Sequence, residues 1–434
     1  MIKQVMNLTM LFCLGSIFSL QGQSDLYAMI DSKADRLEQQ VIEWRRHFHQ
    51  YPELSNREFE TAEKVAQHLT DLGLRVKTGV AHTGVVGILE TGRPGPTVAL
   101  RADMDALPVV ERVDVPFASE VKAEYLGEEV GVMHACGHDT HVAMLMGAAQ
   151  ILTEMKEELT GNIVFIFQPA EEGTPPGEDG GAELMVEEGV LTDPPVDVVF
   201  GLHINSQTEV GKIRYKPRGT MAASDRFVIK VKGAQTHGSQ PWGGIDPIVV
   251  SANIIQGLQQ IVSRQTELTR EAAVISVGKI KGGVRNNIIP EEVEMIGTIR
   301  TLDTKMQDKI HADIKRTAVK IAEASGATAE VDIQKGYPVT YNDPKLTDRM
   351  LPTLQRTAGE DQVLLSNAVT GAEDFSFYAR EVPGLFLFLG GMPKGQSPLE
   401  AAPHHTPDFY IDESGMKLGV RTLCHLTVDY MAAQ

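Results

Sequence analysis

The sequence predicts an α/β protein with a mostly parallel central sheet, covered by helices on both faces, and a second α+β domain inserted into the first. Two observations support this fold class. Short, continuous apolar runs alternate with amphipathic helical segments, and one later segment has a different order of elements. Strands covered on both faces are apolar throughout because neither face meets water, and their alternation with helices is typical of parallel sheets.

The elements begin with helices. Residues 26–48 place apolar side chains at helical spacing. Ser55 and Glu58 have the spacing of a capping box, which predicts a helix over about 58–72 that ends at Gly73.

Four apolar runs define the predicted sheet: residues 97–101, 162–167, 197–202 and 385–389. Ligands bind beyond the carboxyl ends of the strands in such sheets. Three runs lead into residues that can carry chemistry there, namely Asp103 and Asp105, Glu171 and Glu172, and His203. The sequence therefore predicts the functional site at this edge.

The segment 217–335 follows the order β-α-β-β-α-β, which is the ferredoxin-like unit. Its predicted strands are 225–233, 272–282, 292–300 and 327–334, and its predicted helices are 246–265 and 304–325. We expect it to be an inserted domain between the two parts of a catalytic domain, residues 24–216 and 336–434.

Composition and charge exclude several classes of protein. The 434 residues are 42% apolar and 23% charged, as in soluble globular chains, which excludes a disordered or collagen-like chain. The net charge of −18 argues against a nucleic-acid or anionic-membrane partner, because binding phosphate needs clustered Lys and Arg. Three cysteines in a chain of this length do not form a disulfide framework.

Residues 1–23 differ from the rest of the chain. Lys3 is followed by an apolar run from Val5 to Leu20, which is short and weak for a membrane span. This pattern predicts a signal peptide and an exported protein, periplasmic or secreted. The alternative is a buried N-terminal helix.

The densest group of metal-binding residue types is His134–His141. Cys136 and His138 flank a glycine before a predicted helix, so sulfur and imidazole could reach one zinc ion. The alternative is a buried cysteine beside histidines at a helix start. We expect His141 to be a packed histidine, and Asp139 to be a helix cap or a partner of a ligand histidine.

Glu171 and Glu172 are adjacent carboxylates, which usually repel each other and lie in solvent. After a buried strand that faces a Cys-His cluster, one could bind a metal while the other acts as a general base. His203 could be a ligand or a satisfied buried histidine. His405 lies in a Pro-rich loop, where we expect its neighbour His404 to be a surface residue.

These segments together offer more ligands than one ion needs. A catalytic zinc site uses three protein ligands, whereas five ligands and a water suit two metals. A thiolate favours zinc, although carboxylates and imidazoles also admit manganese or cobalt. The five candidate ligands are Cys136, His138, Glu172, His203 and His405.

Several motifs, in order, resemble metallopeptidase family twenty. They include RADMDALP, HACGHDTH, FQPAEEG, THGSQPWGGIDPI, GGVRNNIIP and HHTPDF. The similar branch contains hippurate hydrolase, N-acyl-amino-acid amidohydrolases, N-acetyldiaminopimelate deacetylase and the auxin-conjugate (IAA–amino acid) hydrolases. The resemblance covers nearly the whole chain after residue 25. It implies a zinc-exopeptidase-like fold and a metal-dependent amidohydrolase that cleaves N-acyl amino acids.

The resemblance also implies roles for single residues. Cys136 would bridge two divalent ions, and Asp103 stands where other branches have a ligand histidine, so His138 takes over a coordination role. The remaining implied roles are metal ligation by Glu172, His203 and His405, general base catalysis by Glu171, a supporting carboxylate at Asp105, contact with the substrate carbonyl by His237, and contact with the substrate carboxylate by Asn287 and Arg285.

Three alternatives remain open at this point. A dipeptidase or carboxypeptidase on the same scaffold would differ only in its pocket. A cysteine hydrolase would use Cys136 as nucleophile with a histidine base. A metal-binding protein without catalysis would need no base such as Glu171. The expected substrate is a small N-acyl amino acid or short peptide, and the inserted domain would close over it or form a homodimer.

Overall fold

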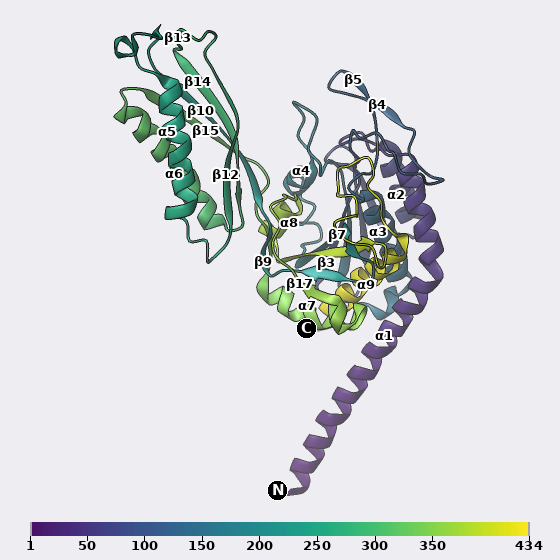
Figure 1. Ribbon diagram of the computed structural model, residues 1–434. Helices are drawn as coiled ribbons and strands as arrows, with labels where there is room; N and C mark the ends of the chain where they lie inside the picture. Colours follow the sequence, from purple (N-terminus) through teal and green to yellow (C-terminus); the bar gives the residue numbers. More distant parts are fainter. Residues whose placement is uncertain (1, 433–434) are drawn as a thin grey trace. The chain divides into compact units, whose positions relative to one another are not determined.

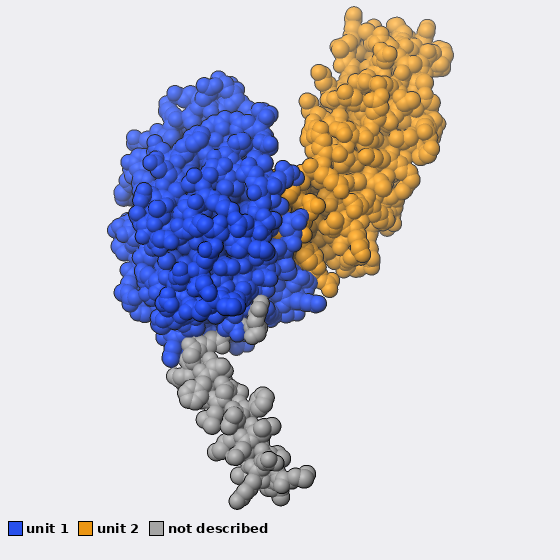
Figure 2. Space-filling view, turned by 180° about the vertical axis from the view of Figure 1, so that it is seen from behind, with its two compact units in different colours: residues 1–215, 343–365, 381–434 blue, residues 216–342, 366–380 orange. Residues whose placement is uncertain are grey.

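The computed structural model describes the backbone of residues 2–432 and the side chains of residues 25–432 (Figure 1). The chain divides into two compact units (Figure 2). Unit 1 comprises residues 1–215, 343–365 and 381–434, and unit 2 comprises residues 216–342 and 366–380. The signal peptide predicted at residues 1–23 lies outside the residues whose side chains are described. Among the described residues, no helix combines the length and apolarity that a membrane crossing requires.

Unit 1 is built on an eight-stranded sheet with the order β1-β2-β6-β3-β7-β18-β8-β17. At its centre β3 pairs in parallel with β6 and β7, and β7 pairs in parallel with β18, so the predicted parallel core is confirmed. Its strands are β1 (Arg75–Val80), β2 (Gly84–Glu90), β3 (Thr97–Asp103), β6 (Asn162–Gln168), β7 (Val198–Glu209), β8 (Ile213–Tyr215), β17 (Val363–Leu365) and β18 (Gly384–Met392).

Both faces of this sheet are covered. Every residue of β3 and β18 is buried, and successive residues of a strand point to opposite faces. Helices α3 and α9 pack on β3 and β7, and on each other and α1. The helices of unit 1 are α1 (Ile2–Gln50), α2 (Phe59–Asp71), α3 (His138–Glu154), α4 (Gly181–Glu187), α7 (Pro344–Ala358) and α9 (Met416–Ala432), and a hairpin is formed by β4 (Lys122–Tyr125) and β5 (Glu128–Gly131).

Unit 2 contains the predicted ferredoxin-like order of elements. Its four-stranded antiparallel sheet has the order β12-β14-β10-β15, and α5 and α6 pack against it. Asp246 and Asp303 cap the two helices by accepting backbone N–H groups of the first turns. The elements are β10 (Ala223–Lys232), α5 (Pro247–Gln260), β12 (Ala273–Gly282), β14 (Glu292–Thr301), α6 (Thr304–Ala324) and β15 (Thr328–Lys335), with the short strands β11 (Thr236–His237) and β13 (Ile288–Ile289).

The limits of unit 2 differ from the predicted 217–335. The strand β9 (Arg218–Met221) pairs with β16 (Thr340–Asn342), which extends the unit beyond the last predicted strand. A second segment, residues 366–380, also belongs to it and includes most of α8 (Phe375–Glu381). This segment is joined by backbone hydrogen bonds, from the Val369 N–H to the Thr220 carbonyl at 3.0 Å and from the Ala222 N–H to the Gly371 carbonyl at 2.9 Å.

Candidate metal centre

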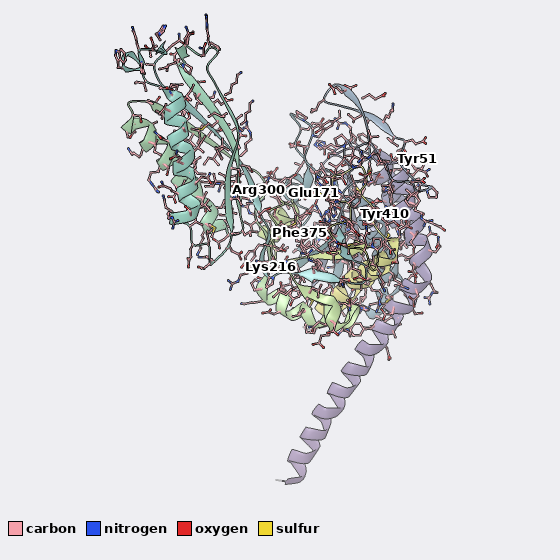
Figure 3. The ribbon with its side chains drawn as sticks, in the orientation of Figure 1. Tyr51, Glu171, Lys216, Arg300, Phe375 and Tyr410 are labelled. Atoms are coloured by element: carbon pink, nitrogen blue, oxygen red, sulfur yellow. The ribbon has the colours of Figure 1, made fainter. Side chains whose placement is uncertain are left out.

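The carboxyl ends of the central strands in unit 1 bring the predicted residues together. The β3–β6 register pairs Asp103 with Gln168, so the residues that follow both strands lie at one edge. His203 lies within β7, opposite Phe388 of β18. Glu171 lies among the side chains of this unit (Figure 3). Cys136 and His138 reach the same place from the start of α3.

The sulfur of Cys136 is surrounded by imidazole nitrogens. Its Sγ atom lies 3.4 Å from Nε2 of His203 and 3.3 Å from Nε2 of His405. Burial, with the charges of Glu172 and Glu171, raises the pKa of the Cys136 thiol well above its ordinary value. A thiolate at this position therefore needs a cation.

Glycine is required between the cysteine and His138. Gly137 has φ of +90°, and a Cβ atom there would lie 2.3 Å from a side-chain carbon of Ile204. The turn that joins Cys136 to α3 can therefore pack against β7 only with glycine. It is also tied to the last loop, because the His405 N–H donates to the Ala135 carbonyl at 2.9 Å.

His138 presents one nitrogen to a group of carboxylates. Its Nδ1–H donates to the Asp105 carbonyl at 2.9 Å. Its Nε2 is buried without a hydrogen-bond partner among the described residues, 3.8 Å from a Glu171 oxygen and 3.9 Å from Oε1 of Glu172. Although burial opposes protonation, Asp103 and Asp105 raise the pKa of His138 to about 10. Nε2 of His138, which has no hydrogen-bond partner among the described residues, therefore lies near two carboxylates, where a bound cation would be stabilised.

Asp105 fixes the turn that carries the two glutamates. Its carboxylate accepts the backbone N–H of Glu171 at 3.1 Å and that of Glu172 at 3.0 Å. The hydroxyl of Ser55 donates to the same carboxylate at 2.7 Å. The predicted supporting carboxylate therefore acts on the backbone of the glutamates as well as on His138.

Glu58 holds the other side of this turn, a position that the sequence did not predict. Its carboxylate accepts the Ala170 N–H at 2.9 Å and the Thr83 hydroxyl at 2.6 Å. Ala170 has φ of +53°, a left-handed conformation that costs a non-glycine residue roughly 1–2 kcal/mol. Burial and the charge of Asp105 raise the pKa of Glu58 to about 8.

The predicted capping box is therefore wrong. Helix α2 begins at Phe59, and Glu58 makes no side-chain hydrogen bond to its first turn. Ser55 and Glu58 instead turn toward Asp105 and Ala170, which are distant in sequence. The spacing of Ser55 and Glu58 singles out both residues in the sequence, but it could not identify their partners Asp105 and Ala170.

Asp103 and His141 lie beside the candidate ligands, and both nitrogens of His141 are already used in hydrogen bonds. The Asp103 carboxylate accepts Nη1 of Arg101 at 2.6 Å and Nδ1–H of His141 at 2.5 Å. Nε2 of His141 accepts the Ile204 N–H at 2.8 Å. Both nitrogens of His141 are thus engaged, as expected for a packed histidine. Asp139 does not cap α3 but pairs with Arg45 and His49.

The expectation that His404 is a surface residue is wrong. Its Nδ1 lies 3.6 Å from the Cys136 sulfur, and its Nε2 accepts the Ser206 N–H at 3.2 Å. A neutral imidazole carries one N–H, so Nδ1 holds the proton and donates toward sulfur. In His405 the nitrogen that can bind a cation is Nε2, which lies 3.2 Å from Oε1 of Glu172.

The donor set fits two divalent cations. Ligand atoms of Cys136, Glu172 and His405 lie within 4.8 Å of one another, and so do those of His138, Glu171 and Glu172. The two groups share Glu172. The buried Nε2 of His138 lacks any other partner among the described residues. Thiolate, imidazole and carboxylate together suit transition metals.

The remaining predicted residues lie together in unit 2. The pairing of β11 with β13 places His237 opposite Ile288, and the Gly238 N–H donates to the Asn287 carbonyl at 2.8 Å. The Ile288 N–H reaches the Arg285 carbonyl at 3.3 Å. Two motifs that are about fifty residues apart in sequence therefore form one exposed surface.

The chemistry that His237 can perform follows from its tautomer. Its Nδ1 accepts the Ser239 N–H at 3.0 Å and lies 2.7 Å from the Ser239 hydroxyl. A neutral His237 therefore carries its proton on Nε2 and can donate it to an oxygen of a ligand.

Known proteins are similar to this chain in sequence and in fold. Thermostable carboxypeptidase 2 of Saccharolobus solfataricus is 41% identical over 94% of this chain and 99% of its own. The IAA-amino acid hydrolase ILR1-like 4 of Arabidopsis thaliana is 36% identical over 99% of this chain and 94% of its own. The crystal structure of the YXEP protein of Bacillus subtilis, described as a dinuclear metal binding peptidase, has a TM-score of 0.76 and 33% identity, covering 91% of this chain and 98% of its own.

The profile of peptidase family M20/M25/M40 matches residues 99–429, which include the donor groups at the strand ends and the polar surface of unit 2. The ordered motifs, the shared-glutamate donor set and these matches agree. The chain belongs to peptidase family M20/M25/M40, a family of metal-dependent amidohydrolases and peptidases.

Proposed function

We propose that this hydrolase cleaves the amide bond of N-acyl amino acids, hippurate-like or similar conjugates. The observation that carries the proposal is the pair of adjacent glutamates whose backbone is fixed by Asp105. Glu172 shares one ligand group with Cys136 and His405 and a second with His138, whereas of these two groups Glu171 belongs only to the second. One carboxylate is thus placed to bind metal and its neighbour to act as a base.

The ligands proposed for two divalent ions are Cys136, His138, Glu172, His203 and His405. Zinc or manganese is proposed, with cobalt as a substitute, because the set mixes sulfur, nitrogen and oxygen donors. When bound, such ions supply the Lewis acidity that activates water and polarises an amide carbonyl. The fixed partners of the ligands orient them, since Nδ1 of His138 and Nδ1 of His203 both donate to backbone carbonyls.

Glu171 would act as the general base. Its carboxylate takes a proton from the attacking water and later gives it to the leaving amine. The hydrogen bond from the Glu171 backbone N–H to the Asp105 carboxylate holds Glu171 in place during both proton transfers. Its burial, with 7% of the residue exposed, keeps competing water away from the carboxylate.

The polar surface of unit 2 is proposed to bind the rest of the substrate. Nε2–H of His237 would donate to the carbonyl oxygen as negative charge develops on it. Asn287 and Arg285 would meet the carboxylate of the amino acid. These three residues share one surface because β11 and β13 are paired.

A substrate panel with the metal-loaded protein tests the proposal. N-acyl amino acids should be hydrolysed, chelation should abolish the activity, and added zinc or manganese should restore it. Faster cleavage of unblocked dipeptides or of peptide carboxyl termini would favour the peptidase alternative, which the carboxypeptidase relative supports.

Two further proposals concern the whole protein. Unit 2 exposes several apolar side chains, including Trp242, Ile248 and Val284, which supports a homodimer formed through this unit. Light scattering tests it, and Trp242→Ser should shift a dimer toward monomer.

Export rests on Lys3 and the apolar run from Val5 to Leu20. An N-terminus shortened by roughly 20–25 residues in the mature protein would support it.

A further inference from the structure

His404 lies beside the candidate metal centre without a role in the proposed mechanism. It is not among the five candidate ligands, yet its Nδ1 lies 3.6 Å from the Cys136 sulfur. Two candidate ligand atoms contact the same sulfur, Nε2 of His203 at 3.4 Å and Nε2 of His405 at 3.3 Å. Three imidazoles therefore surround one sulfur atom, and the third needs a separate explanation.

The backbone at His405 brings two adjacent histidines to this sulfur. Neighbouring side chains of an extended chain point to opposite sides. His405, however, has φ of +63°, a left-handed conformation that is uncommon for residues other than glycine. Its N–H donates to the Ala135 carbonyl at 2.9 Å, which ties the loop to the residue before Cys136. Backbone strain of this kind concentrates at functional sites, which favours a functional reason for the approach of both rings.

The ring of His404 is fixed from its other side. Its Nε2 accepts the Ser206 N–H at 3.2 Å, and the Ser206 hydroxyl donates to the Ala402 carbonyl at 2.8 Å. The ring also packs against the rings of Phe409 and His203, whose centroids are 4.8 Å and 5.3 Å away. Groups other than the sulfur therefore set the orientation of this imidazole.

This orientation decides what His404 can offer to the sulfur. A backbone N–H can only donate, so Nε2 of His404 holds a lone pair and carries no proton. The single proton of the neutral ring is then on Nδ1, which faces the Cys136 sulfur. A protonated Nδ1 has no lone pair for a metal ion. His404 is thus placed to donate a hydrogen bond, although its Nδ1 lies within reach of the same ion as Cys136 and His203.

A bridging thiolate has a lone pair that can accept this hydrogen bond. The sulfur of a thiolate carries three lone pairs, and two of them are used when it binds two metal ions. The third is left for a hydrogen bond, and Cys136 is only 7% exposed, so little water can supply one. A hydrogen bond to the charged form of a group stabilises that form. An N–H donor at this position therefore stabilises the negative charge on the sulfur.

We propose that His404 is a positioning residue whose Nδ1–H donates a hydrogen bond to the Cys136 thiolate and so holds the sulfur in its metal-bound form. The inference rests on the proposed ligation of metal by Cys136. It goes beyond that proposal because it gives a residue outside the ligand set a role in retaining the ions. Partners of metal ligands typically contribute about 10- to 100-fold in metal affinity.

The test compares His404→Asn with His404→Leu in cobalt-loaded protein. The amide N–H of asparagine can take the place of Nδ1–H, whereas leucine has a similar shape and no donor. Both variants lose the bond to Ser206, so they differ in the N–H alone. Cobalt bound to a thiolate absorbs by charge transfer from sulfur, and this band moves to longer wavelength when the sulfur loses a hydrogen bond. We expect this red shift in His404→Leu and a band near the wild-type position in His404→Asn.

His404→Gln provides a second variant without the donor. Its longer amide reaches the position of Nε2 and keeps an acceptor for the Ser206 N–H, so it should fold even if His404→Leu does not. We expect the same red shift as in His404→Leu. Unchanged bands in both His404→Leu and His404→Gln would overturn the hydrogen bond.

Metal affinity, measured by competition with a chelator, gives an independent result. His404→Leu and His404→Gln should bind metal about 10- to 100-fold more weakly than the wild type, and His404→Asn should lose less. Equal affinities in all four proteins would overturn the inference. Loss of one whole ion in every variant, His404→Asn included, would also overturn it, because His404 would then be a ligand itself.

Failure of the proposed function gives a different result. If the metal-loaded wild type cleaves no amide, a red shift in His404→Leu and His404→Gln would still support the hydrogen bond, and only the proposed function would fail. A wild type that binds cobalt without a charge-transfer band from sulfur would overturn the hydrogen bond, because Cys136 would then not be a ligand.

Discussion

The two units expose their polar groups to different degrees. In unit 1 three of the five candidate ligands, Cys136, His138 and His203, are buried, and Nδ1 of His138 is fixed on the Asp105 carbonyl, whereas Glu172 is partly buried and His405 is exposed. In unit 2 His237 is exposed, and its ring contacts only Ser239 through hydrogen bonds among the described residues. The first arrangement is preorganised for cations, whereas the second is suited to bind and release a substrate.

The difference has a physical cause. Burying a carboxylate or a thiolate costs free energy unless a positive charge accompanies it. The ligands of unit 1 are therefore expected to need a bound cation, which their fixed partners hold them ready to receive. An exposed imidazole pays no such cost and needs only the correct tautomer. Substitutions in unit 1 should therefore affect metal content or the chemical step, whereas those in unit 2 should spare the metals.

The largest effect is expected for the adjacent glutamates. Glu171→Gln should lower kcat by roughly two or more orders of magnitude, because the general base is lost, while metal content stays at the wild-type level. Glu172→Gln is the matched control, since it makes the same change one residue away and should also lose metal. Elemental analysis and kinetics of both variants check the assignment. Equal metal loss in the two would show that the roles are wrongly assigned.

A smaller loss is expected in unit 2. His237→Ala should lower kcat about 10²-fold with little change in substrate affinity, because an oxyanion donor acts mainly in the transition state. Ser239→Ala removes only the hydroxyl contact to Nδ1 and should have a weaker effect in the same direction. Both variants should keep wild-type metal content. A raised KM with unchanged kcat would mean that His237 only positions the substrate.

The smallest effect on turnover is expected for Glu58→Gln, less than about ten-fold, because the amide oxygen can still accept the Ala170 N–H. The pH dependence of stability should change more clearly. The pKa of Glu58 is raised to about 8 in the folded protein, so between its ordinary value and 8 the folded state binds the extra proton. The associated stability is present at low pH and is lost as the pH rises through 8.

Thermal unfolding of metal-free protein at several pH values between about 5 and 8 measures this difference. The wild type should lose stability relative to Glu58→Gln as the pH rises. Parallel curves for the two proteins would contradict the raised pKa of Glu58.

The parts of the molecule that could be predicted from the sequence are those with local signals. The apolar strands and the polar residues that follow them predicted the sheet and the edge where Cys136, Glu171 and His203 meet. The roles of Ser55 and Glu58 could not be predicted, since their partners Asp105 and Ala170 are set by tertiary contacts. The position of His404 beside Cys136 depends likewise on the Ser206 backbone, which no local pattern places beside it.

The central claim is that the five candidate ligands of unit 1 hold two divalent ions. Metal stoichiometry per chain, measured with activity through chelation and add-back, tests it most directly. We predict two ions per chain in fully active wild type, weaker binding of both in Cys136→Ser, and unequal loss of the two in His405→Ala. One ion per chain in fully active protein would contradict the two-metal site, and undiminished activity without metal would restore Cys136 as a nucleophile.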